Sequence, residues 1–291
     1  MSRRGPSSRC RIEVWTGWSS CASGGRRCWR TATWVFGAEH PGVAVGEAWA
    51  GHIRLRIHAS RAPAASARPI VLALHGGGWC WGTPEQSRWM AGHIAARAGA
   101  VVVAPAYRLA PEHPYPAAVE DCWAALRWVI ENAADLGGDP ERIAVLGDSA
   151  GGTLAAVLAL RSLEEADARL RGQVLIYPLV DLVGLRGPGL GGIVENYLGG
   201  EESRAREWTA SPLRAESHAG LPPALVLTAQ FDPLRPHAER YAAVLRTAGV
   251  DVAMHCPRLA THAYMTLPGL SPASTGGLAR VVAYLNDVLA P

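Results

Sequence analysis

A short strand runs directly into a helix through a serine at residues 142–163. Residues 142–146 (RIAVL) have the pattern of a strand, and residues 150–163 have that of an alanine-rich helix. The turn between them, Gly147-Asp148-Ser149-Ala150-Gly151-Gly152, matches G-x-S-x-G. A turn this sharp strains the serine backbone and requires small neighbours. The pattern therefore predicts that the Ser149 hydroxyl stands above a sheet, at the positive N-terminus of the helix, as a candidate nucleophile.

Predicted strands and helices alternate along most of the chain. Residues 53–57 alternate between apolar and charged, as in a half-exposed strand, whereas 69–74 and 100–104 are continuous apolar runs typical of strands covered on both faces. Alternation of this kind implies βαβ units and an α/β fold with a mostly parallel sheet. Further strands are predicted at 142–146, 173–177, 224–229 and 251–256, and helices at 116–132, 150–163, 236–248 and 272–289.

A second motif, His75-Gly76-Gly77-Gly78-Trp79, follows the strand predicted at 69–74. Consecutive glycines allow backbone N–H groups to face a substrate oxygen without obstruction by side chains. An anion that develops on an attacked carbonyl needs such donors, and the loss of one typically lowers the rate about a hundred- to a thousandfold. The motif therefore predicts the anion-stabilising part of a site that contains the nucleophilic serine.

A nucleophilic serine needs a base, and the base needs an orienting acid. In strand–serine–helix sites the acid and then the histidine follow the serine along the chain. Asp232 directly follows the strand predicted at 224–229 and is the preferred acid, with Asp181 as the alternative. Of the three later histidines, His237 falls on a helix and His255 inside a strand. His262 lies in the loop after the last strand and is the preferred base.

Composition excludes several classes of function. The chain has 291 residues and a net charge of +3, so nothing calls for nucleic acid or an anionic membrane as a partner. It contains no lysine, which excludes a Schiff-base mechanism. It has neither a secretory h-region nor a run long enough to span a membrane, and we expect a cytoplasmic protein. The sequence contains no CxxC pair, so zinc binding has little support. We expect reduced thiols at Cys10, Cys21, Cys28, Cys80, Cys122 and Cys256.

Residues 1–40 differ in composition from the catalytic domain expected at 41–291. They are rich in arginine, cysteine and tryptophan and show no sustained periodicity. Two interpretations remain open: the segment is a divergent lid over the site, or it is poorly ordered or comes from a wrongly assigned start. We expect an enzyme lacking residues 1–38 to remain soluble. The glycine-rich stretch 183–212 lacks a strand pattern and is predicted to form a cap or loop excursion above the sheet.

These motifs resemble the hormone-sensitive lipase family of microbial esterases. The resemblance runs from about residue 69 to 285 and rests on the order of four segments. HGGGW at 75–79 precedes YRLAPEHPYPAAVEDC at 107–122, which is followed by GGDPERIAVLGDSAGG at 137–152 and FDPL at 231–234.

The resemblance implies an α/β-hydrolase fold with helices on both faces of the sheet. It implies hydrolysis of short- to medium-chain acyl esters through an acyl-enzyme, without a cofactor or metal. It also implies pairing of two copies through the last strand. For the site, it implies a catalytic triad and an oxyanion hole. The triad is Ser149, Asp232 and His262, and the oxyanion donors are the N–H groups of Gly77, Gly78 and Ala150.

The chain departs from the family pattern in three places. Residues 1–40 do not resemble the helical cap of the family, so we expect a small or degenerate cap. Leu234-Arg235 is followed by Pro236-His237 where the family has an acidic pair, and Thr261-His262-Ala263-Tyr264 replaces a segment like HGF.

Other side chains near the motifs have predicted roles. Trp79, Trp81 and Tyr107 are candidate walls of a substrate pocket. Asp148 is expected to form structural hydrogen bonds, and Cys80 is expected to be a packed thiol.

Two alternative functions remain open. The same machinery would serve an amidase, deacetylase or arylformamidase if the pocket accepted an amide. A small-molecule receptor on an inactive hydrolase fold is the other alternative, and retention of all three triad residues argues against it.

Overall fold

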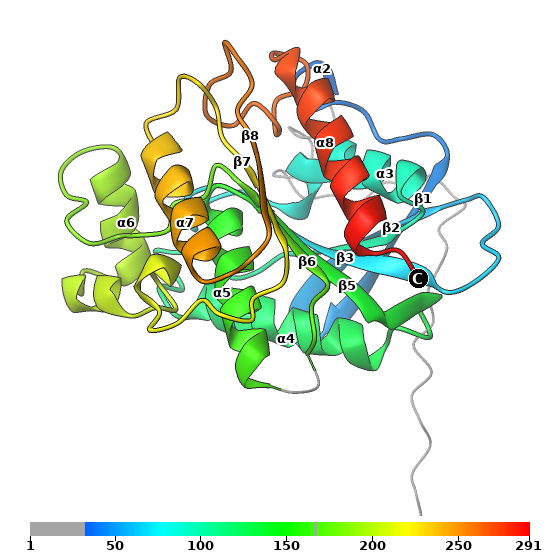
Figure 1. The fold of residues 1–291 in the computed structure, drawn as a ribbon, viewed down its shortest axis with the longest axis horizontal. Coiled ribbons are helices and arrows are strands. Elements are labelled where there is room, and N and C mark those ends of the chain that lie inside the picture. Colours follow the sequence, from blue (N-terminus) through cyan, green and yellow to red (C-terminus); the bar gives the residue numbers. More distant parts are fainter. Residues whose placement is uncertain (1–32, 166–167) are drawn as a thin grey trace, which may run out of the picture.

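The computed structural model describes residues 33–165 and 168–291 (Figure 1). An eight-stranded sheet with the order β1-β2-β4-β3-β5-β6-β7-β8 forms its centre. The strands are β1 (Val43–Ala50), β2 (Ile53–Ser60), β3 (Arg68–Leu74), β4 (Val101–Pro105), β5 (Gly138–Asp148), β6 (Gly172–Ile176), β7 (Ala224–Leu227) and β8 (Val252–His255). The helices are α2 (Thr33–Phe36), α3 (Arg88–Arg97), α4 (Ala117–Glu131), α5 (Ala150–Glu164), α6 (Leu190–Leu198), α7 (Arg235–Thr247) and α8 (Ala273–Val288).

Most of the sheet is parallel. β1 pairs antiparallel with β2, and β2 pairs antiparallel with β4, at one edge. All the other pairs, from β4–β3 to β7–β8, are parallel. The carboxyl ends of β3, β5, β6, β7 and β8 therefore meet at one edge of the sheet, where α/β folds place their ligands.

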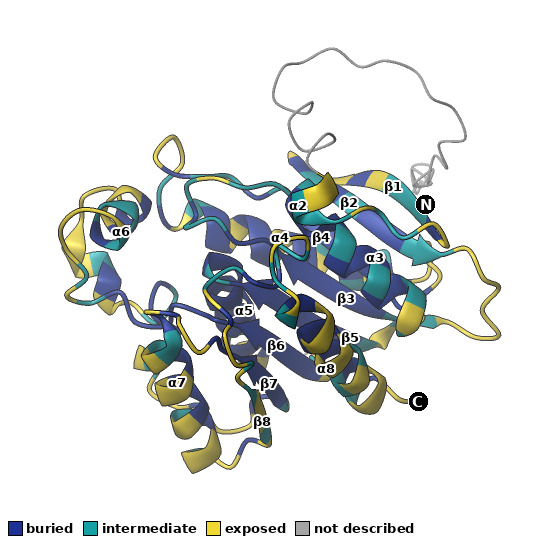
Figure 2. Ribbon diagram, turned by 90° about the horizontal axis from the view of Figure 1, so that it is seen from above, coloured by how far each residue is buried: buried dark blue, intermediate teal, exposed yellow. Residues whose placement is uncertain are grey.

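Helices cover both faces of the sheet (Figures 1 and 2). α4, α5 and α7 pack in one apolar cluster, and α3 and α8 pack in a second cluster across the sheet. β4, β6 and β7 are buried along their whole length, which explains their continuous apolar sequences. The predicted α/β class and the predicted mostly parallel sheet are confirmed.

Four of these elements have no counterpart in the prediction: α2, β1, α3 and α6. β1 contains Gly46 and Glu47, which interrupt its apolar pattern. α3 begins with a buried arginine, Arg88, so the sequence RWMAGHIAAR lacks a clean apolar face. α6 contains Gly191 and Gly192 and lies within the predicted excursion 183–212, at the side of the molecule in Figure 1.

The segment predicted to be atypical, residues 1–40, lies largely outside the described residues. Its described part is residues 33–40, which include α2. Within the described chain, no helix is both long enough and apolar enough to cross a bilayer.

Candidate active site

Ser149 lies between β5 and α5 in a strained backbone conformation, with φ 53° and ψ −118°. Its N–H donates to the carbonyl of Ile176 at the end of β6, over 2.8 Å. The flanking glycines are required because the chain turns back on itself. A Cβ at Gly147 would lie 2.0 Å from the carbonyl oxygen of Gly151. The predicted turn is thus present, and it exposes the serine hydroxyl at the carboxyl edge of the sheet.

His262 and Asp232 complete a line of hydrogen bonds from Ser149. Nε2 of His262 lies 3.0 Å from Ser149 Oγ, and Nδ1 lies 2.8 Å from Asp232 Oδ2. The Asp232 carboxylate is inaccessible to solvent, and its Oδ1 also accepts the N–H of Leu234 over 2.8 Å. With Nδ1–H donating to the aspartate, Nε2 is left to accept the proton of the serine hydroxyl.

The alternative acid and bases lie elsewhere. The carboxylate of Asp181 forms two hydrogen bonds with the Arg214 guanidinium, of 2.7 and 3.1 Å. His237 lies on α7, and His255 lies on the edge strand β8. The histidine loop (residues 261–267) instead carries His262 back over the sheet, assisted by a parallel bridge between Phe231 and Thr261. The altered sequence after Asp232 does not disturb this geometry.

The glycine loop (residues 75–82) provides unpaired N–H groups beside Ser149. Gly77 and Gly78 have φ values of 125° and 59°, which favour glycine. Within the described chain, the N–H groups of Gly77, Gly78 and Ala150 donate to no protein acceptor. A Cβ at Gly77 would lie 2.0 Å from the carbonyl oxygen of Trp81, so the close approach requires glycine as well.

Buried side chains support the start of the glycine loop. His75 stacks on Tyr107 at a ring distance of 4.2 Å, and the Tyr107 hydroxyl donates to the carbonyl of His75 over 2.6 Å. The carbonyl of Gly76 accepts Nδ1–H of His75 (2.8 Å) and the Gln86 side-chain amide (3.0 Å). Burial lowers the pKa of His75 to about 4, so the ring is neutral at pH 7 and serves a structural role.

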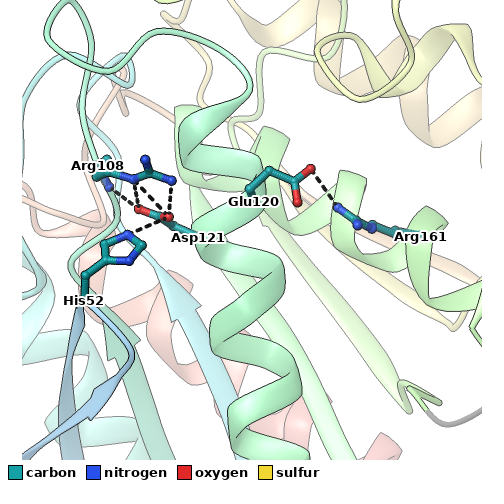
Figure 3. Close-up of polar contacts among 5 residues, drawn as sticks. All are labelled: His52, Arg108, Glu120, Asp121 and Arg161. Carbon is teal, nitrogen blue, oxygen red and sulfur yellow. Dashed lines mark hydrogen bonds and ion pairs between the residues drawn. The ribbon is translucent and has the colours of Figure 1, made fainter.

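Arg108, the residue after Tyr107, is held by a buried carboxylate on α4 (Figure 3). Arg108 donates to the buried Asp121 carboxylate through its backbone N–H, Nε and Nη2 over 2.7–3.1 Å, and His52 Nε2 lies 3.1 Å from the same carboxylate. Burial alone would raise the pKa of Asp121, but the hydrogen bonds and charge of Arg108 outweigh burial and lower it. The neighbouring Glu120 faces outward and pairs with Arg161. Asp121 therefore ties α4 to the support of the glycine loop.

A cavity of about 450 Å³ opens beside Ser149. Its lining is mainly apolar and comes from α2, the glycine loop and the short helix after it, the turn between β5 and α5, α6, and the loops after β6, β7 and β8. The lining residues are Phe36, Gly76, Gly77, Gly78, Trp79, Trp81, Gln86, Asp148, Ser149, Ala150, Leu179, Leu190, Ile193, Pro233, Leu234, His262, Ala263 and Thr266.

The three predicted pocket walls differ in position. Trp79 lines the cavity but is nearly fully buried and stacks on Tyr197 at 4.2 Å. Trp81 lines the cavity and is 55% exposed, at its rim. Tyr107 is not among the lining residues, which corrects the prediction. It lies beneath the glycine loop, where its ring stacks on the ring of His75.

Residues from segments with weak sequence patterns also line the cavity. Phe36 comes from α2, and Leu190 and Ile193 come from α6. Thr266 comes from the histidine loop, four positions after His262. Its closeness to His262 in the sequence is the only feature from which its place in the cavity could be predicted. Among the described residues, no group of three or more His, Cys, Asp and Glu side chains is arranged to hold a metal ion.

Comparison with known proteins identifies the family of the chain. Residues 71–266 match the model of a family described as having the alpha/beta hydrolase fold.

The chain belongs to this family.

Among curated relatives, the chain is similar to esterase LipI of Mycobacterium tuberculosis, with 39% identity over 82% of this chain and 79% of that protein. It is also similar to ethyl acetate hydrolase of Pseudomonas putida, with 35% identity over 77% and 75% of the two chains. Among solved structures, it resembles the thermophilic carboxylesterase EstE1 from a metagenomic library, with a TM-score of 0.82, 33% identity and coverage of 91% and 95%. The predicted α/β-hydrolase fold and the predicted resemblance to esterases are confirmed, and these relatives are named as carboxylic ester hydrolases.

Proposed function

We propose that this chain is a serine carboxylesterase that hydrolyses short- to medium-chain acyl esters through an acyl-enzyme. The observation that carries the proposal is the line from Ser149 Oγ to His262 (3.0 Å) and from His262 to Asp232 (2.8 Å). Three unpaired N–H groups lie at the same end of the sheet. A nucleophile, a base and an orienting acid beside such donors suit acyl transfer.

In the proposed reaction, Ser149 Oγ attacks the ester carbonyl while His262 Nε2 takes the hydroxyl proton. Asp232 holds the imidazole in the tautomer that leaves Nε2 free, and it stabilises the imidazolium that forms. The N–H groups of Gly77, Gly78 and Ala150 receive the negative charge that develops on the carbonyl oxygen. His262 then returns the proton to the leaving alcohol, and water releases the acid in a second half-cycle.

The composition of the cavity supports a neutral, apolar substrate. None of the described residues that line the cavity is an arginine, and the chain has no lysine, so this part of the lining offers no arginine or lysine side chain to a substrate carboxylate. A volume of about 450 Å³ lies within the range of small-molecule sites and suits a short or medium acyl group.

The test is hydrolysis of p-nitrophenyl esters from acetate to palmitate by the wild type and three variants. Ser149→Ala should abolish turnover, and Asp232→Asn should lower kcat about 10⁴-fold because the wrong histidine tautomer is favoured. Asp181→Asn is the matched control. Asp181 pairs with Arg214 and not with His262, so this variant should have nearly the wild-type kcat. A folded wild type without turnover, or equal losses in the two aspartate variants, would overturn the proposal.

A parallel series of p-nitroanilides and aryl formamides tests the amidase, deacetylase and arylformamidase alternatives. Faster turnover of these substrates than of the esters would favour those activities. Binding of esters without turnover would favour the receptor alternative. A cytoplasmic location and pairing of two copies remain predictions.

A further inference from the structure

The carboxylate of Asp148 bridges two loops that both line the cavity beside Ser149. Its Oδ1 accepts the N–H of Gly76 at the start of the glycine loop, over 3.0 Å. Its Oδ2 accepts the hydroxyl of Thr266, in the histidine loop, over 3.0 Å. Each oxygen of one carboxylate thus holds a different part of the proposed machinery.

The space around this bridge admits little variation. Asp148 is 3% exposed, and a Cβ on Gly76 would lie 2.4 Å from Asp148 Oδ2. Gly76 is therefore held against the carboxylate at a distance that no other residue type allows without movement. Since Gly77 and Gly78 follow directly, the position of Asp148 influences where their N–H groups point.

In the histidine loop, Thr266 ends a turn that begins at Ala263, the residue after His262. Its N–H donates to the carbonyl of Ala263 over 3.0 Å, and Ala263 has a φ of 65°. The hydroxyl of Tyr177 lies 3.3 Å from Thr266 Oγ1, and the Tyr177 ring lies 4.7 Å from the His262 ring. With the Thr266 proton committed to the carboxylate, Tyr177 donates to Thr266 Oγ1. The hydroxyl of Thr266 thus connects the histidine turn with the carboxylate.

We propose that Thr266 is a positioning residue whose hydroxyl, through Asp148, fixes the histidine loop relative to the glycine loop. The bridge keeps the spacing between His262 and the proposed oxyanion donors constant while Ser149 reacts. This inference rests on the proposed function, because the spacing matters only if both loops act on the same substrate atoms. Burial raises the pKa of Asp148, an effect that the two donated hydrogen bonds oppose.

The experiment compares Thr266→Val, which keeps the shape and loses the donor, with Thr266→Ser, which keeps the hydroxyl. With p-nitrophenyl butyrate, Thr266→Val should lower kcat about 10- to 100-fold, because misplacement of about 1 Å in reacting groups can cost about a hundredfold. KM should change less than about threefold. Thr266→Ser should retain kcat within about threefold of the wild type.

A second readout does not depend on ester turnover. A fluorophosphonate probe reacts with an activated serine, and its rate of labelling of Ser149 is followed by intact mass. We expect Thr266→Val to label about 10- to 100-fold more slowly and Thr266→Ser at nearly the wild-type rate. If the wild type is labelled but hydrolyses no ester, the labelling rates still test the bridge while the proposed substrate class fails.

The inference would be overturned if Thr266→Val had the wild-type kcat and the wild-type labelling rate. It would also be overturned if Thr266→Val and Thr266→Ser lost activity equally. If Thr266→Val does not fold, the smaller Thr266→Ala replaces it, with the same expected losses and the same refuting outcome. A folded wild type that neither turns over esters nor reacts with the probe overturns both the inference and the proposed function.

Discussion

A single methyl group added at Gly78 tests the proposed role of the glycine loop. A Cβ built on Gly78 would lie 2.6 Å from Cγ2 of Ile193 on α6. Carbon atoms pack at about 3.5–4.0 Å, so the loop or α6 must move by about 1 Å. Ile193 cannot easily turn its methyl away, because a β-branched side chain in a helix has one strongly preferred rotamer.

A displacement of about 1 Å would carry a donor outside the 2.7–3.1 Å reach of an oxyanion. We expect Gly78→Ala to lower kcat about 10²- to 10³-fold, or roughly 3–4 kcal/mol of transition-state stabilisation. KM should change much less, since the donors act mainly on the charge that develops in the transition state. The assay is steady-state hydrolysis of p-nitrophenyl butyrate, with circular dichroism to verify folding.

Gly99→Ala is the matched control for this prediction. Gly99 has a φ of 62°, close to the 59° of Gly78, and its Cβ would meet nothing within 4 Å. Both variants should lose about 1–2 kcal/mol of stability from the left-handed backbone. Only Gly78→Ala should lose activity, and the double variant Gly78→Ala/Ile193→Ala should recover most of it relative to Ile193→Ala. Equal kcat values in the two single variants, or no recovery in the double variant, would refute the reasoning.

Three further predictions follow from the described residues. Phe36→Ala should raise the ratio of kcat/KM for octanoate over acetate esters about tenfold, because Phe36 lines the cavity; Trp34→Ala, at a 71% exposed position outside the lining, should leave this ratio unchanged. Burial, and then the charge of Arg56, lower the pKa of His58 to about 3, so below pH 6.5 the unfolded chain binds a proton that the folded chain does not. The free energy of unfolding of His58→Leu, measured by urea denaturation, should therefore rise relative to that of the wild type by about 1.4 kcal/mol for each pH unit from 6 down to 4. Parallel pH profiles of the two proteins would contradict this. Asp121→Ala should lower the free energy of unfolding by about 3 kcal/mol, whereas Glu120→Ala, which removes an exposed pair, should change it by less than about 1 kcal/mol; similar losses would contradict the assigned anchoring role.

Local patterns predicted the elements whose surroundings are uniform. β4, β6 and β7 are buried on both faces, so their composition alone identified them as strands. Sequence patterns do not predict α3 and α6, because α3 begins with a buried arginine and α6 contains two consecutive glycines, neither of which is typical of a helix. Arg88 is 5% exposed and donates through Nε to the carbonyl of Gly37, 51 residues away in the sequence.

The sequence by itself determined the turn at Ser149 and the glycine loop, because both depend on backbone space within a few residues. Only the tertiary structure decided which carboxylate meets His262, and that Thr266 and Phe36 join the site while Tyr107 lies beneath it. His262 lies 30 residues from Asp232 and 113 from Ser149 along the chain. Parallel pairing brings the ends of their strands to one edge of the sheet. Which side chains then turn toward Ser149 depends on contacts between loops that no local pattern encodes.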